Sequence, residues 1–166
     1  MVSKTLFSSA KQDYETPDDL FAWAHERWGF TIDACAVRAN AKLPRYWNPR
    51  QDGLTQPWHQ KGIGLHVWCN PPYNQLKHWV EKAYNEAIDN DALSVLLIPA
   101  RTDTKIWHSY VFNHASEVYF IKGRLRFKGA PSSAPFPSAL VVYGSGADQT
   151  VYGQLIKTPE GLWRVA

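Results

Sequence analysis

Hydrophobic and polar positions along this chain follow two different periods, which predict strands and helices in alternation. Unbroken apolar runs over residues 63–69 and 93–99 predict buried strands. Between them, apolar residues spaced i, i+3, i+4 and i+7 over 76–88 predict an amphipathic helix capped by Asn74. The later expected elements are a helix over 104–114, strands over 117–121 and 139–143, and a terminal hairpin over 151–165. This succession predicts an α/β fold with a mostly parallel central sheet.

The first part of the chain predicts one helix and one short strand. Thr16 suits an N-cap, Pro17 suits the first helical position, and Gly29 ends the helix. A short strand follows over 30–36 and brings Asp33 to its end. A length of 166 residues predicts a single domain over 13–166, with residues 1–12 as a flexible polar tail.

The run over 63–69 stops at Asn70, because the next two residues are prolines, which cannot donate to a strand ladder. In an open α/β sheet, ligands bind at the carboxyl ends of strands. The Asn70 side-chain oxygen and the Pro71 carbonyl would form a pair of acceptors for the two N–H bonds of an amine, and Tyr73 would stack on a planar ring. The alternative is a structural turn in which Pro71 and Pro72 close the strand and Tyr73 packs.

Composition excludes some classes of protein and indicates another. No apolar run approaches the roughly 20 residues of a membrane helix, and residues 1–10 lack a signal-peptide core, so a cytoplasmic protein is expected. The histidines and cysteines show no metal-ligand spacing, so no metal is expected. The net charge of +3 is unevenly distributed. The basic residues expected to contact nucleic acid are Arg45, Arg50, Lys122, Arg124, Arg126 and Lys128.

The four basic residues over 122–128 alternate along the chain, which predicts that they share one face of a strand or ribbon. A solvated, edge-protecting strand is the alternative. Phe136 follows in a loop rich in proline and serine, where an exposed aromatic ring has no core role. The alternative for Phe136 is a loop anchor.

Asn70-Pro71-Pro72-Tyr73 is similar to motif IV, (Asp/Asn/Ser)-Pro-Pro-(Tyr/Phe/Trp), of S-adenosylmethionine-dependent amino methyltransferases. The helix start at Thr16-Pro17 resembles motif X of the same family, and residues 33–36 resemble motif I without its Gly-x-Gly. In their linear order, the motifs over 14–143 resemble the small phage-type DNA N6-adenine methyltransferases.

The resemblance implies a reduced class I methyltransferase fold, a Rossmann-like three-layer sandwich in which loops and one brief strand at 45–47 replace repeats over 37–62. It implies S-adenosyl-L-methionine as cofactor, DNA as partner, and the cytoplasm of a bacterial host cell as location. The target adenine would be flipped out of the duplex and would pack against Phe136. The implied catalytic residues are Asn70, Pro71, Pro72 and Tyr73. The implied cofactor-binding residues are Tyr14, Thr16, Pro17, Asp33, Ala34, Cys35, Asn40 and Asp52.

Other functions fit the same residues. The Asn-Pro-Pro-Tyr motif also occurs in enzymes that methylate a guanine amine in RNA or a glutamine amide in protein. The absence of glycines after Asp33 is compatible with a nucleic-acid-binding module that has lost catalysis. An Asp-Gly turn at Asp52 needs no ligand to explain it. The sequence gives neither the DNA word nor the oligomeric state.

Overall fold

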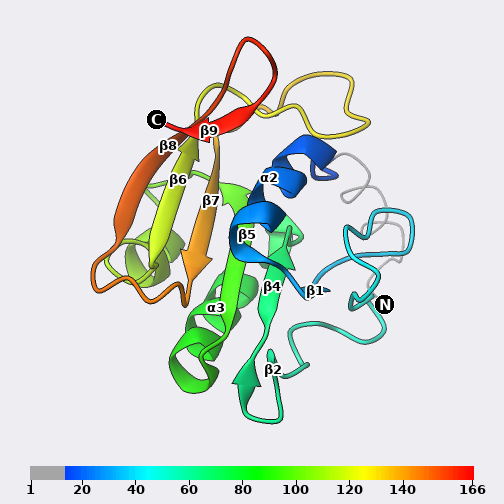
Figure 1. Cartoon of the computed structure of the whole chain (residues 1–166), viewed down its shortest axis with the longest axis vertical. Helices are drawn as coiled ribbons and strands as arrows, with labels where there is room; N and C mark the ends of the chain where they lie inside the picture. The colour runs from blue at the N-terminus through cyan, green and yellow to red at the C-terminus, as the bar shows by residue number, and fades with distance from the viewer. Residues whose placement is uncertain (1–13) are drawn as a thin grey trace.

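The computed structural model describes residues 14–166, so the predicted tail over 1–12 lies outside the described part. Within that part, seven strands form one twisted sheet (Figure 1). In spatial order they are β1 (Ile32–Asp33), β4 (His66–Cys69), β5 (Leu93–Pro99), β7 (Ser138–Tyr143), β6 (Glu117–Ile121), β8 (Val151–Lys157) and β9 (Trp163–Val165).

The sheet has a parallel side and a mixed side. Strands β1, β4 and β5 run parallel to one another, whereas β7 is antiparallel to both β5 and β6. Strand β8 is parallel to β6 and forms the predicted terminal hairpin with antiparallel β9. The parallel side therefore presents the carboxyl ends of β1, β4 and β5 at one edge of the sheet, which is the edge predicted to hold the site.

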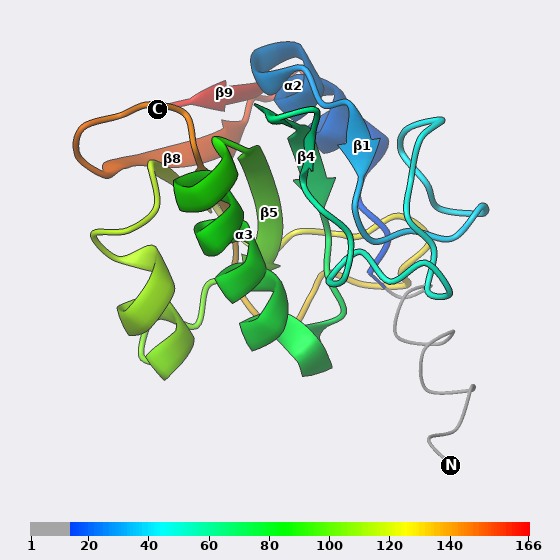
Figure 2. The same ribbon diagram turned by 90° about the horizontal axis from the view of Figure 1, so that it is seen from below.

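Helices cover both faces of the sheet, which confirms the predicted layered α/β architecture. Helix α2 (Asp18–Trp28) lies on one face, and α3 (Leu76–Asn90) with the π-helical turn η2 (Trp107–Val111) lies on the other (Figure 2). Successive strand residues alternate between the two cores, so that Val67 and Cys69 face α3 while Trp68 faces α2. In residues 14–166 no helix has the length and apolar character needed to cross a bilayer.

The connection from β1 to β4 is reduced, as the resemblance implies. Residues 34–65 contain no helix, and Tyr46 forms a single parallel bridge to Asp33 where a brief strand was expected. A small hairpin of β2 (His59–Gln60) and β3 (Ile63–Gly64) completes this segment.

The prediction that Ile63 belongs to the buried strand is wrong. Its side chain is 73% exposed, because β3 turns back on β2 instead of continuing into β4. The turn needs left-handed backbone at Lys61 (φ 51°) and Gly62 (φ 76°), and the glycine adopts that conformation without steric cost. The buried strand begins only at His66.

Both predicted side-chain caps are also wrong. Helix α2 starts after Pro17, and α3 starts after Gln75, with no side-chain capping hydrogen bond at the N-terminus of either helix. A 3-10 turn, η1 (Tyr73–Gln75), takes up the position where Asn74 was expected to cap. The expected helix over 104–114 is shorter than predicted and ends with η2, because the backbone becomes extended at Phe112 (φ −61°, ψ 126°) and left-handed at Asn113 (φ 62°).

Candidate active site

A pocket of about 200 Å³ lies at the carboxyl ends of β1 and β4. Three chain segments that are far apart in sequence meet around it, over residues 14–16, 33–42 and 68–74. The residues that line it are Tyr14, Glu15, Thr16, Asp33, Cys35, Asn40, Lys42, Trp68, Asn70, Pro71, Pro72, Tyr73 and Asn74. The structure thus brings together all four predicted catalytic residues and five of the predicted cofactor-binding residues.

The side-chain amide of Asn70 is held in one orientation. Its nitrogen Nδ2 donates to the main-chain carbonyl of Tyr14 at 2.7 Å and to Oγ1 of Thr16 at 3.1 Å. A main-chain carbonyl can only accept, so the nitrogen must face Tyr14 and the oxygen Oδ1 must point elsewhere. The amide oxygen of Asn70 is thereby kept as an acceptor at the pocket.

This contact explains why Thr16 does not cap α2. Thr16 is 2% exposed, and its hydroxyl accepts the hydrogen bond from Asn70 across 54 residues of sequence. The segment before α2 is therefore connected directly to the turn after β4. The two motifs, predicted separately, form one polar unit.

The prolines after Asn70 fix the shape of the turn. Pro72 has φ −64° and ψ 127°, and its carbonyl accepts from Gln75 N at 3.0 Å to close the 3-10 turn. The closing bond uses the carbonyl of Pro72 and not that of Pro71. Pro71 is buried and lines the pocket next to Asn70.

Tyr73 lies in an aromatic cluster at the pocket. Its ring centroid is 5.4 Å from the centroids of both Tyr14 and Phe136. The Tyr73 hydroxyl is buried and has no hydrogen-bond partner among residues 14–166. Burial, with a smaller contribution from Tyr14, raises the pKa of Tyr73, so its ring is neutral at physiological pH.

The prediction of an exposed Phe136 is wrong. Phe136 is 7% exposed because its ring packs against Tyr14 and Tyr73 and lies 6.3 Å from Phe127. This burial fits the loop-anchor alternative. The same packing places Phe136 in a T-shaped contact with the Tyr73 ring, next to the predicted base platform.

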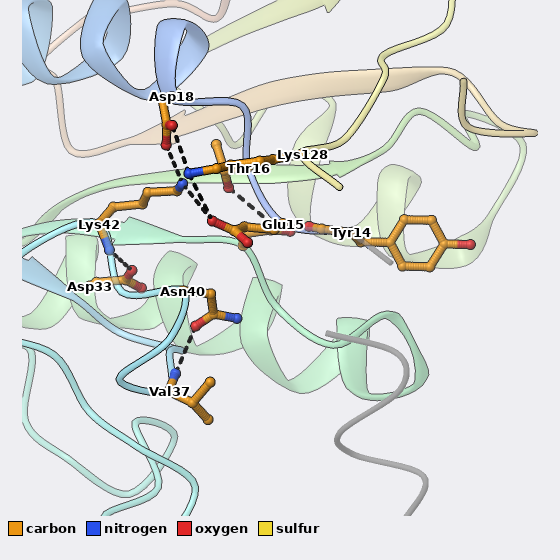
Figure 3. A network of polar contacts seen from close by, with 10 residues as sticks. Tyr14, Glu15, Thr16, Asp18, Asp33, Val37, Asn40, Lys42 and Lys128 are labelled. Carbon is orange, nitrogen blue, oxygen red and sulfur yellow. Dashed lines mark hydrogen bonds and ion pairs between the residues drawn. The ribbon is translucent and has the colours of Figure 1, made fainter. Parts of the chain in front are cut away.

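Polar side chains organise the turn after β1, which lacks glycines. Asp33 is 3% exposed, and its carboxylate accepts from Cys35 N at 3.3 Å and from Lys42 N at 3.1 Å. Asn40 Oδ1 accepts from Val37 N at 2.8 Å (Figure 3). The main chain of residues 35–42 therefore folds over the Asp33 carboxylate, and the Asn40 side chain stabilises the turn over residues 37–40.

An ion-pair network forms the wall of the pocket on the α2 side (Figure 3). Lys42 Nζ lies 3.2 Å from Glu15 and 2.7 Å from Asp18, and Lys128 Nζ lies 2.8 Å from Asp18 and 3.6 Å from Glu15. Hydrogen bonds from Lys128 and Lys42 lower the pKa of Asp18, and the bond to Asp18 raises the pKa of Lys128. The two lysines and two acids neutralise one another.

The family model described as DNA N-6-adenine-methyltransferase (Dam) matches residues 3–142. The chain belongs to this Dam family. The predicted resemblance to small phage-type enzymes is confirmed by two relatives, both named DNA N-6-adenine-methyltransferase. One, from Haemophilus phage HP1 (strain HP1c1), is 28% identical over 129 residues, which cover 76% of this chain and 72% of the relative.

The second Dam-family relative, from Escherichia phage T1, is 29% identical over 113 residues. The match covers 68% of this chain but 45% of the T1 protein, so the chain spans less than half of that relative. A solved structure from Thermoplasma acidophilum, named for a proposed methyltransferase, aligns with 84% of this chain and 68% of its own. Its TM-score of 0.36 and 8% identity are too low to bear on function.

Three predicted cofactor residues of this Dam-family chain do not line the pocket. Pro17 follows the lining residue Thr16, and Ala34 stands between the lining residues Asp33 and Cys35. Asp52 has no lining residue next to it in sequence. Asp52 has left-handed backbone (φ 51°), and its Oδ1 accepts from Leu54 N at 3.1 Å. This geometry fits the alternative of a structural Asp-Gly turn. Gly53 is required there, because a Cβ would lie 2.2 Å from the Ala34 carbonyl oxygen.

The predicted DNA-contacting residues lie outside the pocket. Arg45 and Arg50 are exposed on the loops between β1 and β2. Over 122–128 the four basic residues are exposed while Leu125 and Phe127 are buried, but regular strand ends at Ile121, before the first of them.

Several lining residues carry no functional signal in the sequence. Glu15 and Asn74 adjoin predicted motifs, but Lys42 and Trp68 belong to none. Trp68 lies within the apolar run over 63–69, but the strand pattern assigned no role to it. Among residues 14–166 no group of three or more histidine, cysteine, aspartate or glutamate residues could hold a metal ion.

Proposed function

We propose that this Dam-family chain methylates the N6 amine of adenine in DNA, with S-adenosyl-L-methionine as donor and residues 13–166 as one catalytic domain. The observation that carries the proposal is the fixed Asn70 amide, whose nitrogen is bound to Tyr14 and Thr16 and whose oxygen is left as an acceptor at the pocket. A DNA substrate favours the cytoplasm of the bacterial host cell as the site of action.

The chemistry requires an activated amine. The lone pair of an exocyclic amine is delocalised into the purine ring, which makes the nitrogen planar and weakly nucleophilic. Acceptors at Asn70 Oδ1 and the Pro71 carbonyl would bind its two N–H bonds and favour the pyramidal form as positive charge develops. Tyr73, in T-shaped contact with Phe136, would hold the ring in line for transfer.

The pocket lining suits the cofactor. Bound S-adenosyl-L-methionine supplies an electrophilic methyl group on a sulfonium. Its amino-acid end carries both charges, and it would contact Glu15 and Lys42 as a paired anion and cation rather than as two free charges. The Asp33 carboxylate would accept from a ribose hydroxyl, and the Asn40 amide would accept from or donate to one. The main chain from Tyr14 to Thr16 would lie against the methionine moiety.

The substrate base must leave the duplex to reach this pocket. Unpairing and unstacking cost a few kcal/mol, which contacts to the DNA backbone have to offset. Arg45, Arg50, Lys122, Arg124 and Arg126 are exposed cations that would hold phosphates. The charge of Lys128 is already neutralised by Asp18 and Glu15, so its contribution should be smaller.

The test is methyl transfer from labelled S-adenosyl-L-methionine to duplex DNA, with the modified nucleoside identified by mass. The wild type should yield N6-methyladenosine in its deoxy form. Asn70→Ala should reduce kcat by about 100-fold or more, as the loss of one transition-state contact does elsewhere. Asn74→Ala is the matched control, since Asn74 also lines the pocket but makes no side-chain hydrogen bond within residues 14–166. Full transfer by Asn70→Ala would refute the proposal.

A further inference from the structure

The cations around the pocket fall into two groups. Lys42 and Lys128 are bound to Glu15 and Asp18, and their charge is cancelled locally. Arg101 is exposed, and in residues 14–166 no carboxylate lies within ion-pair distance of its guanidinium. Its positive charge is therefore available to a ligand from outside the chain.

The sheet register places Arg101 farther out than the catalytic turn. Strand β4 ends at Cys69, which pairs with Leu96 of β5. Strand β5 continues for residues 97, 98 and 99 beyond that level, about 10 Å at the usual rise per residue. Arg101 comes two residues after the end of β5, with Ala100 between, so it stands beyond Asn70 on the solvent side of the same carboxyl edge.

The Arg101 side chain is also held in place. Ala100 N donates to the Pro137 carbonyl at 2.8 Å, which fastens the end of β5 to the loop that carries Phe136. The guanidinium carbon of Arg101 lies 5.9 Å from the centre of the Phe136 ring. Phe136 in turn packs edge-on against Tyr73 at 5.4 Å. One aromatic ring therefore separates the free cation from the proposed base platform.

We propose that Arg101 binds a phosphate of the DNA strand beside the flipped adenine; this inference rests on the function proposed above. A base that enters the pocket leaves its own phosphates outside, on the side where Arg101 stands. The planar guanidinium can bind two phosphate oxygens at once. Stacking on Phe136 orients it before DNA arrives, which reduces the entropy lost on binding.

The experiment measures binding of a labelled duplex by fluorescence anisotropy over a series of salt concentrations. A single mismatch at the target adenine lowers the unpairing cost, so that backbone contacts dominate. Two duplexes of unrelated sequence are used. Arg101→Ala should weaken binding to both by roughly tenfold at low salt. Arg101→Ala should also make the negative slope of log K against log[salt] shallower by about 0.9, the value for one phosphate.

Arg164→Ala is the control for loss of one positive charge. Arg164 is exposed on β9, and β7, β6 and β8 lie between that strand and β5. Arg164→Ala should keep the wild-type slope of log K against log[salt]. Arg101→Lys should recover most of the slope that Arg101→Ala loses. Because Arg101 is exposed, thermal unfolding of its variants should match that of the wild type.

The outcomes separate the two proposals. An Arg101→Ala variant with the wild-type slope, beside a wild type that methylates DNA, overturns the phosphate assignment alone. A loss confined to one of the two duplexes also overturns it, since that result identifies a base contact. A wild type that transfers no methyl group to DNA overturns the proposed function itself.

Discussion

Replacing Asn70 by aspartate tests the geometry of the site more sharply than replacing it by alanine. The motif that Asn70 resembles accepts Asp, Asn or Ser at this position, so the motif alone predicts an active variant. The structure predicts the opposite. In Asn70→Asp an oxygen replaces Nδ2 and faces the Tyr14 carbonyl oxygen, a partner that can only accept, at 2.7 Å.

The size of the effect follows from the two contacts that Nδ2 makes. The Thr16 hydroxyl can reverse its role and donate to the new carboxylate, so the contact at 3.1 Å can survive. The Tyr14 contact cannot, and leaving such an acceptor unsatisfied costs about 1–3 kcal/mol. If that cost is borne in the transition state, kcat/KM falls roughly 5- to 150-fold at neutral pH.

The loss of activity in Asn70→Asp should depend on pH. Burial and the facing carbonyl should raise the pKa of the introduced carboxyl above its usual value of about 4. Below the raised pKa the neutral acid can donate its O–H to Tyr14 and imitate the amide. Above it the anion cannot, so the deficit relative to wild type should grow as pH rises through the pKa.

The assay is kcat/KM for methyl transfer to DNA between pH 5.5 and 8.5, for wild type, Asn70→Asp and Asn74→Asp. Asn74→Asp adds the same charge at the same pocket without a Tyr14 contact, so it reports the effect of charge on DNA binding. The excess loss in Asn70→Asp measures the amide geometry. An Asn70→Asp enzyme as active as Asn74→Asp at every pH would refute the reasoning.

Two further predictions concern the segments that hold the amide. Thr16→Val keeps the side-chain shape but removes the acceptor for Asn70, so kcat should fall roughly fivefold or more. Thr16→Ser keeps the hydroxyl and should have a kcat near that of the wild type. Loss of kcat in both variants would contradict a role for the hydroxyl. Gly53→Ala would place a Cβ 2.2 Å from the Ala34 carbonyl oxygen, which should cost about 1–3 kcal/mol and lower Tm by roughly 2–12 °C. Differential scanning calorimetry measures the Tm of Gly53→Ala. An unchanged Tm would show that the loop containing Asp52 and Gly53 can shift away from the end of β1 without cost.

Local patterns in the sequence predicted the elements that their own residues determine. The apolar run of β5 and the helical spacing of α3 are both found where expected, because burial on a sheet or helix face imposes a period. The prediction for Ile63 is wrong because it used this period alone. Its apolar side chain matches the period of β4, but left-handed backbone at Lys61 and Gly62 turns it into a separate hairpin.

Contacts between distant segments were not predictable in the same way. Thr16 is a good N-cap by composition, yet a partner 54 residues later binds its hydroxyl instead. Phe136 stands between two prolines in a loop and outside any strand or helix period, so its burial against Tyr14 and Tyr73 could be seen only in three dimensions. Lys42 belongs to no motif, and only the folded loop brings it to Glu15.

The turn after β1 lacks the glycines that the resemblance predicts after Asp33. A glycine-rich turn lets the main chain approach a ligand because it has no side chains. Here the turn obtains its shape from polar side chains: Asp33 binds Cys35 N and Lys42 N, and Asn40 binds Val37 N. The missing glycines therefore do not by themselves argue for an inactive module. The loop that replaces them brings Lys42 to the pocket and to Glu15, which connects the turn after β1 to the segment that orients Asn70.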